Sequence, residues 1–207
     1  TGANGQLGLA LQEAAKESNL EIVFMDKHSL DITNAEAVKE VFAIQSFDFC
    51  INTAAYTDVN GAETNKELAY AINASAVETL AKVCKENGCW LIHISTDYVF
   101  DGTLDRPYTP EDTPNPLNVY GASKLAGEQA IALVGGTYSI MRTSWLYSRY
   151  GNNFYTKLQA QLDAGKTLQV TADQKGCPTR AEDLAAHLLN GIVSQQLPTG
   201  ISHYCGS

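Results

Sequence analysis

The sequence lacks a long apolar run and is short of basic residues. No apolar stretch approaches the roughly 20 residues that cross a bilayer, so we expect no membrane-spanning helix. Lysine and arginine number 14 against 23 acidic residues, which gives a net charge of −9. Nucleic acid is therefore not an expected partner, because a phosphate backbone binds to a basic face. No secretory signal pattern precedes the first motif, so we expect a cytoplasmic protein with no membrane partner.

Metal-binding and disulfide patterns are also missing. The five cysteines are scattered without a C-x-x-C pair, and the four histidines form no metal-ligand spacing. We expect reduced thiols and no protein-made metal site. These residues are Cys50, Cys84, Cys89, Cys177, Cys205, His28, His93, His187 and His203.

Segments with a helical period alternate with short, nearly continuous apolar segments along most of the chain. Helices are expected over residues 6–16, 35–44, 63–70, 74–87, 119–134, 153–164 and 180–194, and strands over 20–25, 47–52, 89–95, 137–142 and 200–204. An extended piece is expected at 167–171. This alternation predicts an α/β fold with a doubly wound parallel sheet of the Rossmann type. We divide the chain into a dinucleotide-binding domain, 1–144, and a small, irregular substrate-binding part, 145–207, incomplete and interleaved with the main sheet.

Glycines near the start of the sequence have the spacing of a dinucleotide-binding turn. Gly2, Gly5 and Gly8 allow a tight turn, close approach of a pyrophosphate and close packing of the following helix. Asp26 ends the next expected strand, where a carboxylate binds the adenosine ribose. Lys27 beside it is able to accept a 2′-phosphate, so NADH and NADPH both remain open. The glycine fingerprint requires a strand before its first glycine, and the sequence shows none, so we expect the sequence to be incomplete at its start. Residues Gly200–Tyr204 resemble a strand that enters the core just before the sequence stops, so we expect it to be incomplete at its end as well.

A tyrosine and a lysine lie one helical turn apart in the expected helix 119–134. Tyr120 and Lys124 share one face of that helix, so the lysine ammonium is able to lower the pKa of the phenol and to reach a bound ligand. A hydroxyl from Ser95 or Thr96, 24 or more residues upstream, would complete a proton-transfer site. The Tyr-x-x-x-Lys spacing alone is common in ordinary helices.

Eight motifs in order resemble the dTDP-4-dehydrorhamnose reductases, a family of the extended short-chain dehydrogenase/reductase superfamily. They are Gly2–Gly8, Leu30–Ile32, Asn52–Thr57, Ser95–Gly102, Tyr120–Glu128, Arg142–Trp145, Gly151–Phe154 and Asp173–Thr179. The resemblance implies reduction of the C4 keto group of dTDP-4-dehydro-L-rhamnose with NADPH or NADH, for nucleotide-sugar and cell-surface polysaccharide biosynthesis. It also allows a homodimer.

The resemblance implies a role for each matching residue. Tyr120 would protonate the C4 oxygen, Thr96 would hydrogen-bond it, and Lys124 would hold the nicotinamide ribose and lower the pKa of Tyr120. The implied cofactor-binding residues are Gly2, Gly5, Gln6, Leu7, Gly8, Asp26, Asp31, Ile32, Ala55, Tyr56, Thr57, Tyr120 and Lys124. The implied substrate-binding residues are Thr96, Asp97 and Trp145.

Alternatives remain open. A noncatalytic subunit similar to the regulatory subunit of methionine adenosyltransferase, or another nucleotide-sugar epimerase or dehydratase, is compatible with the same fold. Trp145 also suits a core position, and 152–153 and 173–174 suit turns. The sequence departs from the family at Asn60–Glu63, and Ala10 stands where a magnesium-binding glutamate would be expected, so metal-linked dimerisation is not expected.

Overall fold

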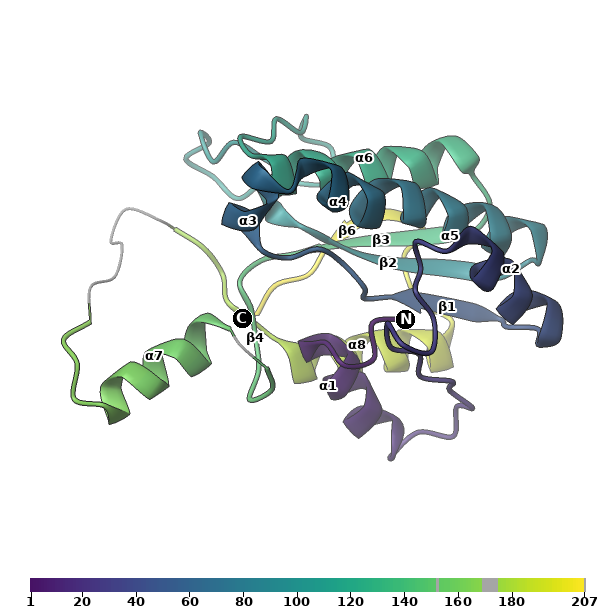
Figure 1. Cartoon of the computed structure of the whole chain (residues 1–207), viewed down its shortest axis with the longest axis horizontal. Coiled ribbons are helices and arrows are strands. Elements are labelled where there is room, and N and C mark those ends of the chain that lie inside the picture. The colour runs from purple at the N-terminus through teal and green to yellow at the C-terminus, as the bar shows by residue number, and fades with distance from the viewer. Residues whose placement is uncertain (152, 169–174, 207) are drawn as a thin grey trace.

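A parallel sheet of four strands, in the order β1-β2-β3-β6, forms the centre of the protein (Figure 1). The computed structural model describes residues 1–151, 153–168 and 175–206. The strands are β1 (Phe49–Asn52), β2 (Trp90–Thr96), β3 (Tyr138–Thr143) and β6 (Gly200–His203). In register, Asn52 pairs with His93, Thr96 with Thr143, and Arg142 with His203.

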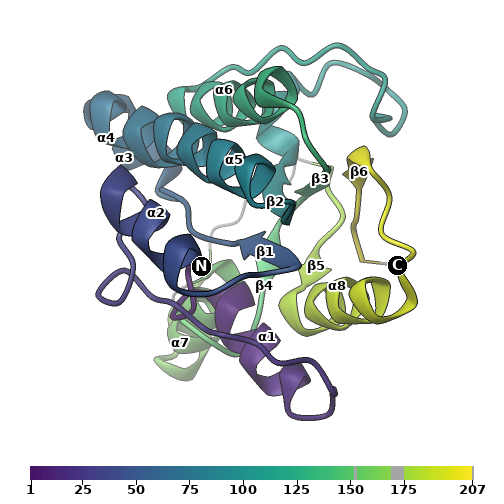
Figure 2. The same ribbon diagram turned by 90° about the vertical axis from the view of Figure 1, so that its right-hand side faces the viewer.

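Helices cover both faces of the sheet, as a doubly wound fold requires (Figure 2). They are α1 (Gln6–Ala15), α2 (Ala35–Ile44), α3 (Val59–Thr64), α4 (Lys66–Tyr70), α5 (Ala76–Glu86), α6 (Val119–Val134), α7 (Phe154–Asp163) and α8 (Ala181–Ser194). Helices α1 and α8 lie on one face, and α2 to α6 lie on the other. A π-helical turn, Ala71–Ser75, joins α4 to α5, and a 3₁₀ turn, Asp97–Val99, follows β2.

Alternating side chains of the central strands build two hydrophobic cores. Leu91 and Ile140 pack with α2, α5 and α6, whereas the next residues, Ile92 and Met141, pack with α1 and α8. All four are at most 2% exposed. Successive strand residues point to opposite faces, so nearly continuous apolar strands are what a sheet covered on both sides needs. The predicted fold class is confirmed.

The strand predicted at 20–25 is wrong. These residues have extended backbone but join no sheet of the described residues. A cavity of about 330 Å³, lined by Ile22, Phe24, Phe49 and Ile51 among others, separates them from β1. A strand needs backbone partners at hydrogen-bonding distance, and the cavity keeps that distance too large. The apolar sequence of 20–25 instead packs against the α1–α8 core.

The other predicted helices and strands agree with the structure except at their ends. The helix expected at 63–70 is two short helices, α3 and α4, and a pair of two-residue strands, β4 (Leu146–Tyr147) and β5 (Thr179–Arg180), was not predicted. The extended piece expected at 167–171 lies mostly outside the described residues. Strand β6 belongs to the main sheet, and helix α8 packs with α1 on one face of that sheet. The predicted division between a dinucleotide-binding domain and a substrate-binding part at residues 144/145 stays a prediction.

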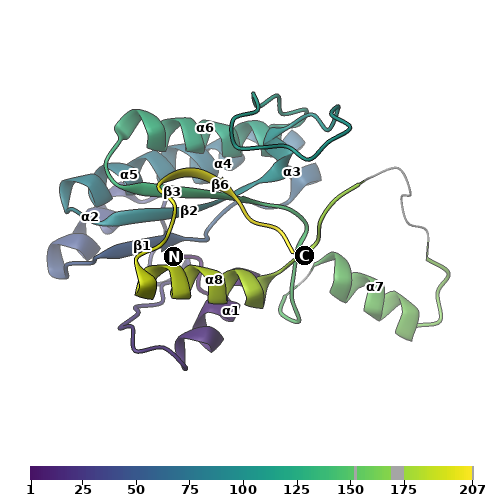
Figure 3. The same ribbon diagram turned by 180° about the vertical axis from the view of Figure 1, so that it is seen from behind.

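Helix α7 projects from the layered body (Figure 3). Its Phe154 and Leu162 side chains are 64% and 59% exposed. Over the described ranges, no helix is both long and apolar enough to cross a membrane.

Candidate active site

The carboxyl ends of three neighbouring strands bring the predicted site residues to one edge of the sheet. Segment 53–57 follows β1, Asp97 follows β2, and Trp145 lies just after β3. Because these strands are parallel and adjacent, their carboxyl ends meet at the same edge. In open α/β sheets, ligands bind in this position.

The glycine turn leaves no room for side chains. A Cβ atom on Gly2, whose φ is +74°, would lie 2.6 Å from the Ala54 nitrogen, and one on Gly8 would lie 2.3 Å from the Gly2 oxygen. Gly5 precedes α1 with extended backbone, and no described side chain caps the first amides of the helix. These amides are therefore available to phosphate oxygens, assisted by the helix dipole.

Asp26 lies beside this turn, as a ribose-binding residue should. Its Oδ2 accepts a 2.6 Å hydrogen bond from the Asn4 side chain, and its Oδ1 accepts from the backbone nitrogens of His28 and Ser29. Hydrogen bonds from Ser29 lower the pKa of Asp26, which keeps it a carboxylate. The half-buried Asp26 thus links the glycine turn to the 26–29 turn.

Three other predicted cofactor residues have side chains already engaged. Leu7 and Ile32 are 3% and 5% exposed and belong to the hydrophobic cores, so only their backbones are available to a ligand. Asp31 Oδ1 accepts hydrogen bonds from the backbone nitrogen and hydroxyl of Thr33. These hydrogen bonds lower the pKa of Asp31.

Gln6 joins the glycine turn to a distant loop. Its Oε1 accepts hydrogen bonds from the Ser148 hydroxyl at 3.1 Å and from the Asn153 amide at 2.8 Å. Asn153 also caps α7, because its Oδ1 accepts from the backbone nitrogen of Thr156. Asn153 is thus a helix cap, and its hydrogen bond to Gln6 is a further contact that the sequence did not reveal. Residues 152, 173 and 174 lie outside the described residues.

Asn73 holds the segment that contains Ala55, Tyr56 and Thr57. Its side chain accepts from the Tyr56 nitrogen at 2.8 Å and donates to the Tyr56 oxygen and to Ser123 on α6, each at 3.0 Å. Asn73 is fully buried in the π-helical turn. Sequence reasoning missed it, and its one signal was a polar residue inside an apolar helical pattern. π-turns occur often at functional sites.

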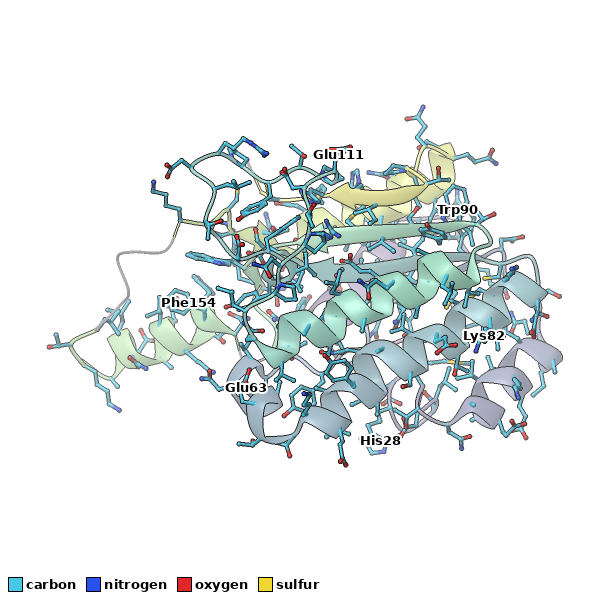
Figure 4. The ribbon with its side chains drawn as sticks, turned by 90° about the horizontal axis from the view of Figure 1, so that it is seen from above. His28, Glu63, Lys82, Trp90, Glu111 and Phe154 are labelled. Atoms are coloured by element: carbon cyan, nitrogen blue, oxygen red, sulfur yellow. The ribbon has the colours of Figure 1, made fainter. Side chains whose placement is uncertain are left out.

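The start of α6 places Tyr120 against the 3₁₀ turn that follows β2. A Cβ atom on Gly121 would lie 2.1 Å from the Tyr98 oxygen, so the two segments approach as closely as backbone allows. The Asn118 side chain accepts from the Gly121 nitrogen and begins the helix, and Glu63 of α3 accepts from the Val119 nitrogen at 2.8 Å. Figure 4 shows Glu63 near this end of α6. The rings of Tyr98 and Tyr120 meet edge to face.

Tyr120 is a protonated phenol at neutral pH. Burial raises the pKa of Tyr120 to about 12, the Thr96 hydroxyl opposes this through a hydrogen bond, and nearby Asp97 adds to it. Burial also raises the pKa of Asp97, whose Oδ1 accepts a hydrogen bond from Thr96. A half-buried phenol that keeps its proton is a proton donor, which suits reduction of a ketone.

Lys124 is directed at the sheet. Its Nζ donates to the Ile94 carbonyl oxygen at 2.7 Å and lies 3.1 Å from His93 Nε2. It is 2% exposed, and burial lowers its pKa to about 8, an effect that Glu128 opposes. The expectation that Lys124 lowers the pKa of Tyr120 does not hold in this structure, where burial dominates and the phenol pKa rises.

Ser95 and Thr96 have different partners, which decides between them. The Ser95 hydroxyl donates to Glu128 at 2.5 Å, and Glu128 forms a buried ion pair with Arg142. Thr96 is the hydroxyl that faces Tyr120. The structure therefore favours Thr96 as the hydroxyl of the proton-transfer site.

Trp145 is not a core residue. Its side chain is 41% exposed, and its φ of 47° lies in the left-handed region that bulky residues avoid. Its ring packs against Gly176, where a Cβ atom would lie 2.6 Å from the ring. The Ser144 hydroxyl donates to the Cys177 oxygen, and the Thr179 nitrogen donates to the Trp145 oxygen, so the loop before β5 is held beside Trp145.

Comparisons with known proteins agree with this arrangement. The family described as "RmlD substrate binding domain" matches residues 1–207. The dTDP-4-dehydrorhamnose reductase of Sinorhizobium fredii is 40% identical over 213 residues, which cover 100% of this chain and 71% of that protein. The reductase of the same name from Salmonella typhimurium is also 40% identical, with 98% of this chain and 70% of that protein covered. The structure of a Bacillus anthracis dTDP-4-dehydrorhamnose reductase in complex with NADP has a TM-score of 0.94 and 41% identity, and covers 100% of this chain and 73% of that one.

The fold and the comparisons define a Rossmann-type oxidoreductase. Within that class, the chain belongs to the RmlD substrate binding domain family.

Proposed function

We propose that the protein reduces the C4 keto group of dTDP-4-dehydro-L-rhamnose to give dTDP-L-rhamnose, with NADPH or NADH as cofactor. The observation that carries the proposal is the half-buried, protonated Tyr120 beside Thr96, at the same edge of the sheet as the glycine turn. Two relatives that are 40% identical to nearly the whole chain carry the name dTDP-4-dehydrorhamnose reductase. A cytoplasmic location and a homodimer are further parts of the proposal, which localisation and sedimentation would test.

The residues present fit a dinucleotide. Gly2 and Gly8 allow the tight turn itself, and the uncapped amides that open α1 suit a pyrophosphate. Asp26 would hold the adenosine ribose, and segment 55–57 would line the middle of the cofactor. When bound, the nicotinamide supplies the hydride.

Tyr120 and Thr96 act on the substrate oxygen. As hydride arrives at C4, the keto oxygen gains negative charge and takes the phenolic proton of Tyr120, while the Thr96 hydroxyl donates a hydrogen bond to it. Lys124, which is charged below a pKa of about 8, would hold a ribose hydroxyl of the cofactor and supply positive charge to the site where negative charge develops. Trp145 offers an exposed ring to the nucleotide sugar beside the loop that ends at Thr179.

The test is oxidation of NADPH with the dTDP-keto sugar, comparing the wild type with Tyr120→Phe. Loss of general acid catalysis costs about 10²- to 10⁴-fold in rate, whereas cofactor affinity should persist. Full turnover by Tyr120→Phe would contradict the mechanism. A wild-type protein that binds NADPH but turns over no keto sugar would favour the noncatalytic subunit instead.

A further inference from the structure

His93 is a fully buried histidine that contacts the catalytic lysine. It lies in the middle of β2 at 0% exposure, and both ring nitrogens have partners. Nε2 lies 3.1 Å from Lys124 Nζ, and Nδ1 lies 3.0 Å from the side-chain nitrogen of Asn52 on β1. A polar line of three side chains therefore runs along the α6 face of the sheet, from α6 to the end of β1.

The ring of His93 is neutral. Burial, and then the positive charge of Lys124, hold the pKa of His93 well below its ordinary value. A neutral imidazole has one N–H donor and one bare acceptor nitrogen, whereas an ammonium has three donors and no acceptor. A charged Lys124 therefore requires that Nε2 be bare and that the ring hydrogen sit on Nδ1.

We propose that His93 is a positioning residue for Lys124. Its bare Nε2 and the Ile94 carbonyl oxygen accept two of the three ammonium hydrogens, and the third is left for a ribose hydroxyl of the cofactor. The inference rests on the proposed function, because it gives Lys124 its catalytic task. Without His93, one of the two hydrogen bonds that fix the ammonium would be lost inside a buried site.

This tautomer also involves Asn52. The Asn52 oxygen accepts from the Ala54 nitrogen at 3.2 Å, and its amide nitrogen faces the ring. Turning the amide presents its oxygen to Nδ1–H and gives up the hydrogen bonds that this oxygen accepts from the Thr1 hydroxyl at 2.7 Å and from the Ala54 nitrogen, at the start of the segment proposed to line the cofactor. His93 thereby connects the charge of Lys124 with the end of β1.

The titratable groups that face Lys124 are few. They are His93 from β2 and, on α6 itself, Glu128 and Tyr120 one turn to either side. Glu128 is already paired with Arg142, and Tyr120 stays protonated up to a pKa of about 12. His93 is therefore the neighbour whose replacement should change the charge of Lys124 most directly.

The first test is the tautomer of His93, measured by ¹⁵N NMR on the wild-type protein at pH 7. We expect a bare Nε2 and a protonated Nδ1. A hydrogen on Nε2 would overturn the proposal, because the ring would then donate to Lys124. This readout does not depend on turnover, so absence of reductase activity in the wild type would contradict the proposed function and leave the tautomer result standing.

The second test compares His93→Gln, whose side-chain oxygen reaches the place of Nε2, with His93→Leu, which has no acceptor. In His93→Leu we expect the alkaline limb of kcat/KM for NADPH to move about one pH unit lower, so that at about pH 9 and above kcat/KM falls about tenfold, since one pKa unit is a tenfold change in protonation. His93→Gln should keep both close to wild type. The control variant Ile92→Ala creates a cavity on the opposite face of β2. It should lower the stability of the protein without shifting the alkaline limb of the pH profile.

An unshifted limb in a folded His93→Leu protein would overturn the proposal. If that variant does not fold, a shifted limb in His93→Gln would have the same meaning, because its acceptor should preserve the lysine charge.

Discussion

Glu128 and Arg142 form a buried ion pair, with Arg142 Nη2 2.6 Å from Glu128 Oε2 and exposures of 3% and 2% for the two side chains. Arg142 Nε donates a second hydrogen bond to Glu128, and Ser95 donates a third. The pair joins α6 to β3 one helical turn after Lys124. The helix that carries the catalytic tyrosine and lysine is thus fixed to the sheet by charge as well as by apolar packing.

We expect Glu128→Gln to destabilise the protein by about 3–5 kcal/mol, because removing one partner leaves the Arg142 charge buried without compensation. The measurement is urea unfolding at pH 7. The double variant Glu128→Leu/Arg142→Met should recover much of the loss, since it leaves no buried charge. A control is the exposed pair Lys39–Glu36, where Lys39→Met should cost less than about 1 kcal/mol. A Glu128→Gln protein as stable as wild type would show that the pair does not stabilise the fold.

The activity should fall at alkaline pH because Lys124 loses its charge. Burial lowers the pKa of Lys124 from 10.5 to about 8, so the ammonium is present below that pH and is lost as pH rises through it. Tyr120, with a pKa of about 12, keeps its proton across the same range. We therefore expect kcat/KM for NADPH to decrease above pH 8. A limb near pH 10.5 would mean that Lys124 is as well solvated as an ordinary surface lysine.

The sequence predicted the parts of this site that follow from local rules. Helical spacing placed Tyr120 and Lys124 on one face of α6, and the glycine pattern predicted the turn before α1. The direction of the Lys124 side chain was not predictable, because it depends on His93 and Ile94 of a strand that meets α6 only in the folded chain. The same holds for Asn73 and for the bond between Gln6 and Asn153, which joins residues 147 positions apart.

The wrong strand at 20–25 has a similar cause. An apolar, β-prone sequence indicates burial, but a strand exists only where a neighbouring backbone offers hydrogen bonds. Here Ile22 and Phe24 are half-buried and line the cavity beside β1, so their apolar character is used in packing without sheet formation.

Gly121→Ala should reduce activity while the fold is kept. The new methyl group would lie 2.1 Å from the Tyr98 oxygen, so the start of α6 must move away from the turn that carries Thr96 and Asp97. A displacement near 1 Å at a reacting group costs about 10²-fold in rate. We expect kcat/KM for the keto sugar to fall by about that factor, measured by NADPH oxidation. Gln129→Ala, an exposed change on the same helix, is the control, and wild-type activity in Gly121→Ala would contradict the close approach.

Trp145 combines an unfavourable backbone conformation with an exposed ring, and two substitutions separate these properties. Both Trp145→Ala and Trp145→Gly remove the ring that packs on Gly176, so both should raise KM for the dTDP-sugar, whereas Trp145→Phe should retain part of the affinity. The glycine variant should be more stable than the alanine variant by about 1–2 kcal/mol, since φ of 47° is costly for every residue with a Cβ atom.

Gln195 is the matched control, because its φ of 55° is also left-handed but it caps α8, away from the predicted site. Gln195→Gly should exceed Gln195→Ala in unfolding free energy by a similar amount, with KM for the sugar unchanged in both. Unfolding by urea and steady-state kinetics on the same samples give the two quantities. If the Trp145 variants lose stability equally and keep the wild-type KM for the sugar, the ring is a packing residue and the sugar binds elsewhere. A raised KM for the sugar with unchanged kinetics for NADPH would instead place the nucleotide sugar against the indole and the loop that ends at Thr179.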